Sequence, residues 1–204
     1  MKTIEVKNSY VLSLLDSIEN YLLHVDCDSL EIDQEECLHL KDEKLSDKYL
    51  KQIMNAGKTH EGYPLFQPKY VLPVESFKHI HKHTTELTEY MFSERVCLDV
   101  LYPPKSYCSW HNNANAPGNA IMFSWSKTGE GDFRYWDNDK KEVIYIPDEK
   151  GWNVKFFNFG DYNQPEKLTY HASSNECLRY SMAFNFITEK QVLDETVELL
   201  TNDE

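Results

Sequence analysis

From Val96 onward, turn-favouring residues divide the sequence into short β-rich runs, and this pattern restricts the possible folds more than any other feature. Turn formers such as Pro103-Pro104 and Gly129-Glu130-Gly131 separate the runs. About seven or eight short strands at this spacing predict a sandwich or jelly roll. The expected strands are Val96–Leu101, Ala120–Lys127, Asp132–Asp137, Glu142–Ile146, Val154–Phe159, Leu168–His171 and Leu178–Ile187.

Helical periodicity dominates the N-terminal part of the chain. Asn8 or Ser9 can cap the first helix, and Gly57 follows the second one in a position that glycine favours. The expected helices cover residues 9–23, 46–56 and 76–92, and the capping box of Thr188 and Gln191 opens a last one. The acidic residues 26–47 are interpreted as a surface loop or hairpin. We therefore expect one domain, with helical support in residues 1–94, a jelly-roll core in 95–187 and a C-terminal helix in 188–204.

Composition argues against several classes of protein. The formal charge is −13, and an acidic chain repels a phosphate backbone, so duplex nucleic acid is not an expected partner. The five cysteines form no CxxC pair, and the first residues lack the apolar core of a signal peptide. No apolar run reaches the length of a membrane span. These features predict a soluble protein of the cytoplasm.

Two histidine-containing stretches are candidates for a metal site. His111 and Asn113 follow a β-like run two positions apart, so on a strand their side chains share one face. A distant histidine such as His171 can complete a facial set of three ligands, as in non-haem Fe(II) oxygenases, whose third ligand is normally a carboxylate. His79 and His83 also have possible metal spacing, but a histidine-rich polar helix face is the favoured interpretation because no HExxH pattern is present.

These landmarks together resemble a known family. Tyr102-Pro103-Pro104-x-x-Tyr107-x-x-x-His111-x-Asn113 is similar to the Y-x-P-G-x-x-Y-x-x-H-x-D run of prolyl-4-hydroxylase-like 2-oxoglutarate/Fe(II) dioxygenases. The Gly129-Glu130-Gly131-x-Phe133 turn, the GWNVKFFNF stretch, and His171-Ala172 followed by Arg179-x-Ser181 resemble its later landmarks. The likeness covers residues 95–187. It implies a mainly β fold with flanking helices around a double-stranded β-helix (jelly-roll) core.

The resemblance also implies a metal centre and a reaction. His111, Asn113 and His171 would hold Fe(II), and O₂ would take the remaining metal position. Oxidative decarboxylation of 2-oxoglutarate would then be coupled to hydroxylation of a C–H bond, with a peptide side chain (prolyl-like) or a small molecule as the substrate.

Four further residues are assigned to the co-substrate by the same resemblance. Arg179 would bind the far carboxylate of 2-oxoglutarate, because a guanidinium offers a bidentate and permanent charge. Ser181 lies two positions along the same strand and could add a hydroxyl donor. Either Tyr102 or Tyr107 could provide a phenol donor.

Asn113 departs from the family pattern. A carboxylate gives a metal a full negative charge and an amide only a dipole, a difference of several kcal/mol in binding. Three outcomes stay open: Asn113 ligates through its oxygen in a working enzyme, an anion such as chloride replaces the carboxylate, or the site has lost iron. In the last case the protein would be a catalytically inactive binding or scaffold module. Glu130, Asp132 and Asp137, on a following turn and strand, could offer a carboxylate to the metal in place of the one missing at position 113.

Overall fold

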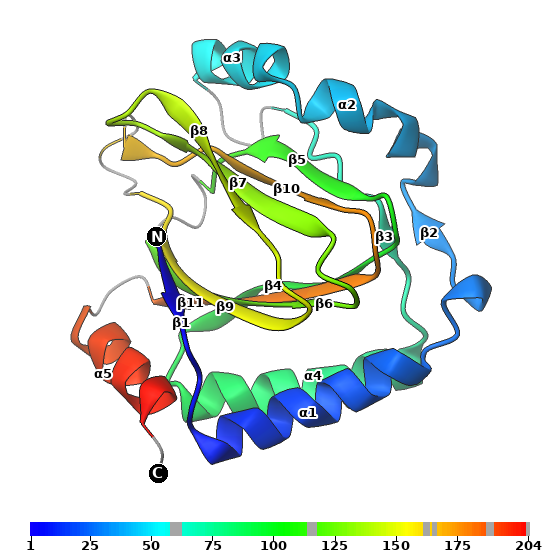
Figure 1. The fold of residues 1–204 in the computed structure, drawn as a ribbon, viewed down its shortest axis with the longest axis vertical. Helices are drawn as coiled ribbons and strands as arrows, with labels where there is room; N and C mark the ends of the chain where they lie inside the picture. Colours follow the sequence, from blue (N-terminus) through cyan, green and yellow to red (C-terminus); the bar gives the residue numbers. More distant parts are fainter. Residues whose placement is uncertain (58–62, 114–117, 161–163, 165–166, 187–189, 203–204) are drawn as a thin grey trace.

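The computed structural model of the chain describes residues 1–57, 63–113, 118–160, 164, 167–186 and 190–202. Two antiparallel β-sheets face each other, and helices cover their outer sides (Figure 1). The protein is therefore mainly β with flanking helices, which confirms the predicted fold class.

The larger sheet has the strand order β1-β9-β6-β11-β4, and the smaller sheet has the order β5-β10-β7-β8. Between β4 and β11 the chain crosses from one sheet to the other at each connection except the β7–β8 hairpin. This is the topology of a jelly roll, or double-stranded β-helix. The strands are β1 (Lys2–Ile4), β4 (Arg95–Tyr102), β5 (Tyr107–His111), β6 (Asn119–Ser126), β7 (Gly131–Asp137), β8 (Glu142–Pro147), β9 (Gly151–Asn158), β10 (His171–Asn175) and β11 (Arg179–Phe186).

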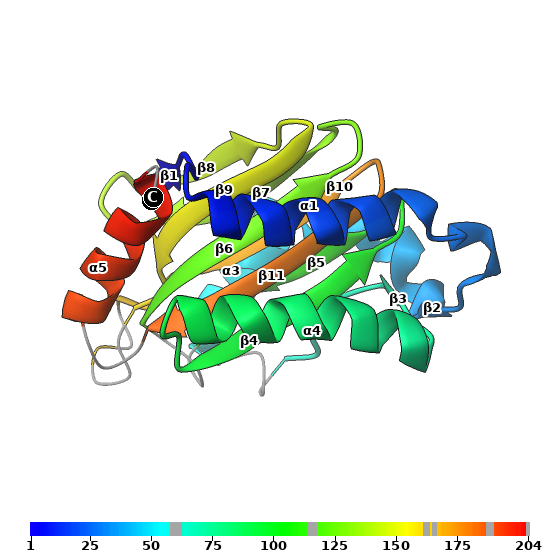
Figure 2. The ribbon, with the colours of Figure 1, turned by 90° about the horizontal axis from the view of Figure 1, so that it is seen from below.

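Large apolar side chains form the outer face of the larger sheet. Phe123 and Trp125 on β6 and Tyr180 on β11 are buried there, and they alternate with small or polar side chains that face the other sheet. Helices α1 (Ser9–His24) and α4 (Val74–Tyr90) run across this face and bury it (Figure 2). The main apolar core thus lies outside the sandwich, which leaves the space between the sheets for a site.

A second apolar cluster covers the smaller sheet. Helix α3 (Asp47–Ala56) packs Ile53 against Tyr107 and Trp110 of β5. The indole N–H of Trp110 donates a hydrogen bond of 3.0 Å to the carbonyl of Leu45 and fixes this contact. The remaining elements are η1 (Cys27–Ser29), β2 (Ile32–Asp33), η2 (Glu35–Leu40), α2 (Lys41–Lys44), β3 (Lys69–Tyr70) and α5 (Lys190–Thr201). Within the described parts of the chain, no helix combines the length and apolarity that crossing a membrane requires.

The predicted ends of the first two helices agree with the structure, whereas α4 begins at Val74 and ends at Tyr90 in place of the expected 76–92. The side chain of Asn8 caps α1 by accepting from the N–H of Val11 at 3.1 Å. Ser46 caps α3 in the same way from the N–H of Tyr49, also at 3.1 Å. Gly57 ends α3 with φ at +62°, a left-handed conformation that glycine adopts without strain.

Several elements differ from the predictions. Strands β1 and β5 lie outside the predicted runs; β5 (YCSWH) shows no polar alternation because α3 covers one of its faces and the sandwich interior the other. Strand β10 begins at His171 and not at Leu168. Residues 26–47 form 3₁₀ turns and a short helix, with only β2 pairing to β3. The predicted cap at Thr188 lies outside the described residues.

Candidate functional site

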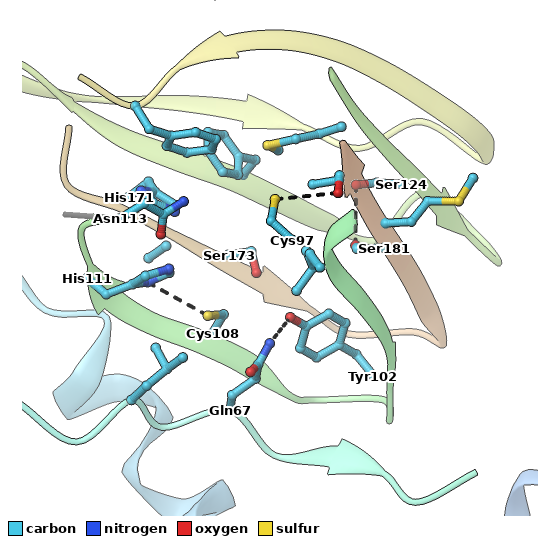
Figure 3. Close-up of a pocket in the computed structure, with 18 of the residues that line it drawn as sticks. Gln67, Cys97, Tyr102, Cys108, His111, Asn113, Ser124, His171, Ser173 and Ser181 are labelled. Atoms are coloured by element: carbon cyan, nitrogen blue, oxygen red, sulfur yellow. Dashed lines mark hydrogen bonds between the residues drawn. The ribbon is translucent and has the colours of Figure 1, made fainter. Parts of the chain in front are cut away.

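A cavity of about 410 Å³ lies between the two sheets, within the size range of small-molecule sites. Strands β4, β5, β6, β10 and β11 provide most of its described walls. Figure 3 shows His111, Asn113 and His171 in one region of the cavity and Tyr102 with Gln67 in another. The predicted site residues are therefore brought together, with the exception of Tyr107.

Space remains between the sheets because many of the inward side chains are small. Ser124 on β6 and Ser181 and Ala183 on β11 face the interior, and Ser173 and Cys108 do the same from the smaller sheet. The hydroxyl oxygens of Ser124 and Ser181 lie 3.3 Å apart. Hydroxyl, thiol and methyl groups thus stand where larger apolar side chains would fill the sandwich, and they leave a partly polar space.

His111 and His171 form the most specific feature of the site. His111 is the last residue of β5 and His171 the first of β10, and the two are paired directly across the antiparallel ladder. Their ring centroids are 4.1 Å apart. Phe133 and Phe159 pack against the ring of His171, with centroid distances of 5.7 and 4.5 Å. Apolar neighbours thus hold the buried ring of His171, whereas His111 is only partly buried.

Backbone carbonyls fix the tautomer of both rings. Nδ1 of His111 lies 2.8 Å from the carbonyl of Ser109, and Nδ1 of His171 lies 3.1 Å from the carbonyl of Thr169. A carbonyl oxygen only accepts hydrogen bonds, so in the neutral ring each Nδ1 carries the proton and Nε2 carries the lone pair. Metal-binding histidines in proteins commonly have this second partner on the opposite nitrogen.

Asn113 lines the same cavity as the two histidines, two residues beyond the end of β5. Among the described residues that line the cavity there is no Asp or Glu. No group of three or more His, Cys, Asp or Glu side chains in the described part of the chain could hold a metal ion. Among the described residues, Asn113 is the amide that lies beside the two histidines and is the candidate third ligand (Figure 3).

The suggested substitute carboxylates are directed elsewhere. Asp132 accepts two hydrogen bonds from Arg134, of 2.6 and 2.5 Å. Asp137 accepts from the backbone in its own turn, and Glu130 accepts from Thr128. The hypothesis that one of them replaces the missing carboxylate is wrong, because each is engaged outside the cavity wall.

Arg179 lies at the end of the cavity close to the turns of the sandwich, at the start of β11. Its side chain is only 2% exposed. The guanidinium donates to the carbonyl of Asp132 and to Oγ of Ser124, both at 3.3 Å. Within the described chain its Nε has no hydrogen-bond partner, although Oδ2 of Asp148 is 3.4 Å away. These contacts use few of the five N–H donors of the guanidinium, which suits a residue that receives a ligand.

Arg179 belongs to a buried triad of ionic side chains. Asp148, with no exposed side-chain surface, lies between Arg179 and Lys155, whose Nζ donates to Oδ1 of Asp148 at 3.1 Å. Burial lowers the pKa of Lys155, and the charge of Asp148 opposes that effect. Two cations and one carboxylate leave a net charge of +1 at this end of the cavity.

The structure distinguishes the two tyrosine candidates. Tyr102 lines the cavity, and its hydroxyl accepts a hydrogen bond from Nε2 of Gln67, which leaves its own proton to donate. Burial raises the pKa of Tyr102 far above its usual range, so the phenol stays protonated. Tyr107 instead donates to the carbonyl of Cys37 at 2.9 Å and packs in the apolar cluster under α3. Of the two tyrosines, Tyr102 therefore lines the cavity and Tyr107 does not.

The thiols of the cavity are neutral. Burial raises the pKa of Cys108 to about 12, and burial of the sulfur atom raises the pKa of Cys97 to about 11, although Cys97 as a residue is exposed. A thiol with such a pKa is a poor nucleophile at neutral pH, because the thiolate is the reactive form. The chemistry of the cavity therefore depends on its imidazoles, amide, hydroxyls and guanidinium.

Three polar residues of this region were missed by the sequence analysis: Gln67, Asp148 and Lys155. Lys155 had a signal, since it is a charged residue within the apolar strand GWNVKFFNF. Gln67 and Asp148 had none, because both lie in connections between elements. The interpretation of the histidines on α4 is consistent with their contacts: His83 lies 3.3 Å from Glu86, and the ring of His79 contacts that of Tyr21.

Comparisons with known proteins identify structural neighbours. No protein-family model matches the sequence, and no curated protein matches it. A Pseudomonas putida prolyl-4-hydroxylase is 12% identical over 84% of this chain and 98% of its own, with a TM-score of 0.36. Hydroxypropylphosphonic acid epoxidase from S. wedmorenis is 12% identical over 89% and 100%, with a TM-score of 0.27. At these scores the similarities carry no argument about function, so a functional proposal has to rest on the residues of the cavity.

Proposed function

We propose that the protein is an Fe(II)/2-oxoglutarate-dependent dioxygenase. The observation that carries this proposal is the pairing of His111 with His171 in a cavity that also contains a buried arginine, Arg179. Two neutral imidazoles suit Fe(II), and a buried guanidinium suits the far carboxylate of a dicarboxylic acid.

The donor set is compatible with iron. His111 and His171 would each offer Nε2, and Asn113 would offer its amide oxygen. 2-Oxoglutarate would bring to the metal the negative charge that Asn113 lacks, so metal and co-substrate should bind together. When bound, the iron would supply the activation of O₂ that couples decarboxylation of 2-oxoglutarate to hydroxylation.

The other residues of the cavity would bind and orient. Arg179 would hold the far carboxylate, with hydroxyl donors from Tyr102 and Ser181 on the same wall. Met122 and Phe133 would keep water from the reacting region. We propose a peptide side chain, prolyl-like, or a small molecule as the substrate; the size of the cavity supports a reacting group no larger than a side chain.

Anaerobic titration calorimetry tests the proposal. Fe(II) and 2-oxoglutarate should each strengthen the binding of the other, and the pair should form succinate when O₂ is admitted. The variants His111→Ala and His171→Ala should lose metal binding, whereas His83→Ala on α4 should behave as the wild type. The proposal is wrong if 2-oxoglutarate does not bind in the presence of Fe(II) and no succinate forms.

The second candidate is a catalytically inactive jelly roll that binds a small carboxylic acid without metal. The absence of Asp and Glu among the described cavity-lining residues favours it. In that case a dicarboxylic acid should bind equally well with and without a chelator, and His111→Ala should leave its affinity unchanged.

A further inference from the structure

The buried triad of Lys155, Asp148 and Arg179 contains more positive than negative charge, and of the three only Arg179 is among the described residues that line the cavity. Lys155 is 3% exposed and Asp148 is fully buried. An ion without compensation in such a place is costly. A structural salt bridge alone would need one cation, so the second cation requires an explanation.

The geometry within the triad is unequal. Lys155 makes a hydrogen bond of 3.1 Å to Oδ1 of Asp148, whereas Arg179 reaches only Oδ2, at 3.4 Å and without hydrogen-bond geometry. Arginine and carboxylate left to themselves favour two parallel hydrogen bonds. Lys155 thus occupies one oxygen of Asp148, and the pair between Asp148 and Arg179 stays incomplete.

We propose that Lys155 is a positioning residue: by holding Asp148, it keeps the charge and the donors of Arg179 available to an anionic ligand in the cavity. This inference rests on the proposed role of Arg179 as the anchor of a carboxylate. It adds that the affinity and the selectivity for an anion are set by a lysine that does not touch the ligand.

Removing the charge of Lys155 has a defined consequence. In Lys155→Met the charges of the remaining Asp148 and Arg179 sum to zero. Asp148 is then free to accept two hydrogen bonds from the guanidinium of Arg179. Anion binding should then weaken by at least about tenfold, since a unit charge lost in a partly buried site changes binding by more than about 1.4 kcal/mol. In the double variant Asp148→Asn with Lys155→Met, Arg179 keeps its charge without a competing carboxylate, so anion binding should return.

The experiment uses glutarate and its uncharged diamide, glutaramide, as probes, titrated by NMR in the presence of a chelator. Wild-type protein should prefer glutarate. Lys155→Met should reduce that preference by at least about tenfold without weakening glutaramide, and the double variant should recover most of it. Lys82→Met, which removes an exposed lysine of α4, controls for the change in total charge.

Folding of each variant is checked by its thermal unfolding. If Lys155→Met does not fold, Lys155→Gln takes its place, and Lys155→Arg should keep the wild-type preference. Wild-type protein that does not prefer glutarate overturns the inference, as does an unchanged preference in Lys155→Met or a double variant as weak as the single one. Because the measurement needs no iron and no turnover, its failure is distinct from that of the proposed oxygenase activity.

Discussion

Gly131 and Asp148 approach so closely that a Cβ atom on Gly131 would lie 2.9 Å from Oδ2 of Asp148. The same atom would lie 2.8 Å from the backbone carbonyl of Ser174, which cannot move aside easily. The N–H of Asp148 also donates to the carbonyl of Gly131 at 3.0 Å. The absence of a side chain at the start of β7 is therefore what admits the carboxylate of the triad.

Gly131→Ala should destabilise the protein by about 1–3 kcal/mol, the usual range for added volume in a packed interior. It should not weaken glutarate binding, because an Asp148 carboxylate displaced from Arg179 competes less for the guanidinium. Chemical denaturation and ligand titration measure the two effects. Gly57→Ala is the control: its Cβ meets nothing within 4 Å, so it should cost stability through its positive φ and leave binding unchanged.

Asn113→Asp should strengthen metal binding by at least about tenfold, because a full negative charge replaces a dipole beside the two imidazoles. Competition of Fe(II) or Co(II) against a chromophoric chelator measures the change. Combining it with His171→Ala should abolish the gain. Equal affinity of Asn113→Asp and wild type would show that residue 113 does not contact the metal.

The two tyrosines should separate function from stability. Tyr102→Phe should weaken binding of a dicarboxylic acid several-fold, since it removes one hydroxyl donor from the cavity, worth about 1 kcal/mol. Tyr107→Phe should leave binding unchanged and cost about 1 kcal/mol of stability through the lost bond to Cys37. The opposite pattern in calorimetry and denaturation would reinstate Tyr107 as the ligand-binding tyrosine.

Asp99 should make the stability of the protein fall as pH rises. Burial raises its pKa above 3.8, although the hydrogen bond of 2.7 Å from Tyr180 acts against the shift. At a pH between the usual pKa of Asp99 in the unfolded chain and its raised pKa in the folded protein, the folded state holds more protons than the unfolded state. Ionisation of Asp99 therefore destabilises the fold. Asp99→Asn keeps the acceptor without the charge. It should be more stable than wild type at neutral pH and equal to it at acidic pH.

Asp137 is the control, because its pKa shift is opposite to that of Asp99 and its effect on stability should have the opposite pH dependence. Backbone hydrogen bonds, first from the N–H of Lys140, lower its pKa. Its ionised form therefore stabilises the fold above its usual pKa, and this contribution is lost as pH falls. Asp137→Asn should be less stable than wild type at neutral pH and equal to it in acid. Denaturation curves across pH that show the same sign for Asp99→Asn and Asp137→Asn would contradict both assignments.

The jelly roll was predictable because turn residues separate strands whose apolar side chains cover the outer face. The histidine pair was also predictable from the sequence. His111 ends one strand and His171 starts another, and the strand ends of a sandwich lie together at its rims. Strand β5 was missed because its sequence, YCSWH, is buried on both sides and shows no alternation.

The residues around Arg179 were predictable from the sequence only in part. Lys155 is anomalous within an apolar strand, but a sequence does not show which carboxylate compensates it. Asp148 and Gln67 lie in connections whose path depends on the packing of distant elements, and Gly131 has a meaning only once Asp148 is placed beside it. Selection between Tyr102 and Tyr107 likewise required the position of α3 and of the chain before it.

The two imidazoles are attached to hydrogen-bonded neighbouring strands, so the spacing of the β-ladder, and not the course of any loop, sets the distance between them. Loops at either rim can change in length without separating the pair. Inserting or deleting one residue within β10, however, would shift its register against β5, so that His171 would no longer pair with His111. Length variation among homologous chains should accordingly spare this strand and accumulate outside it.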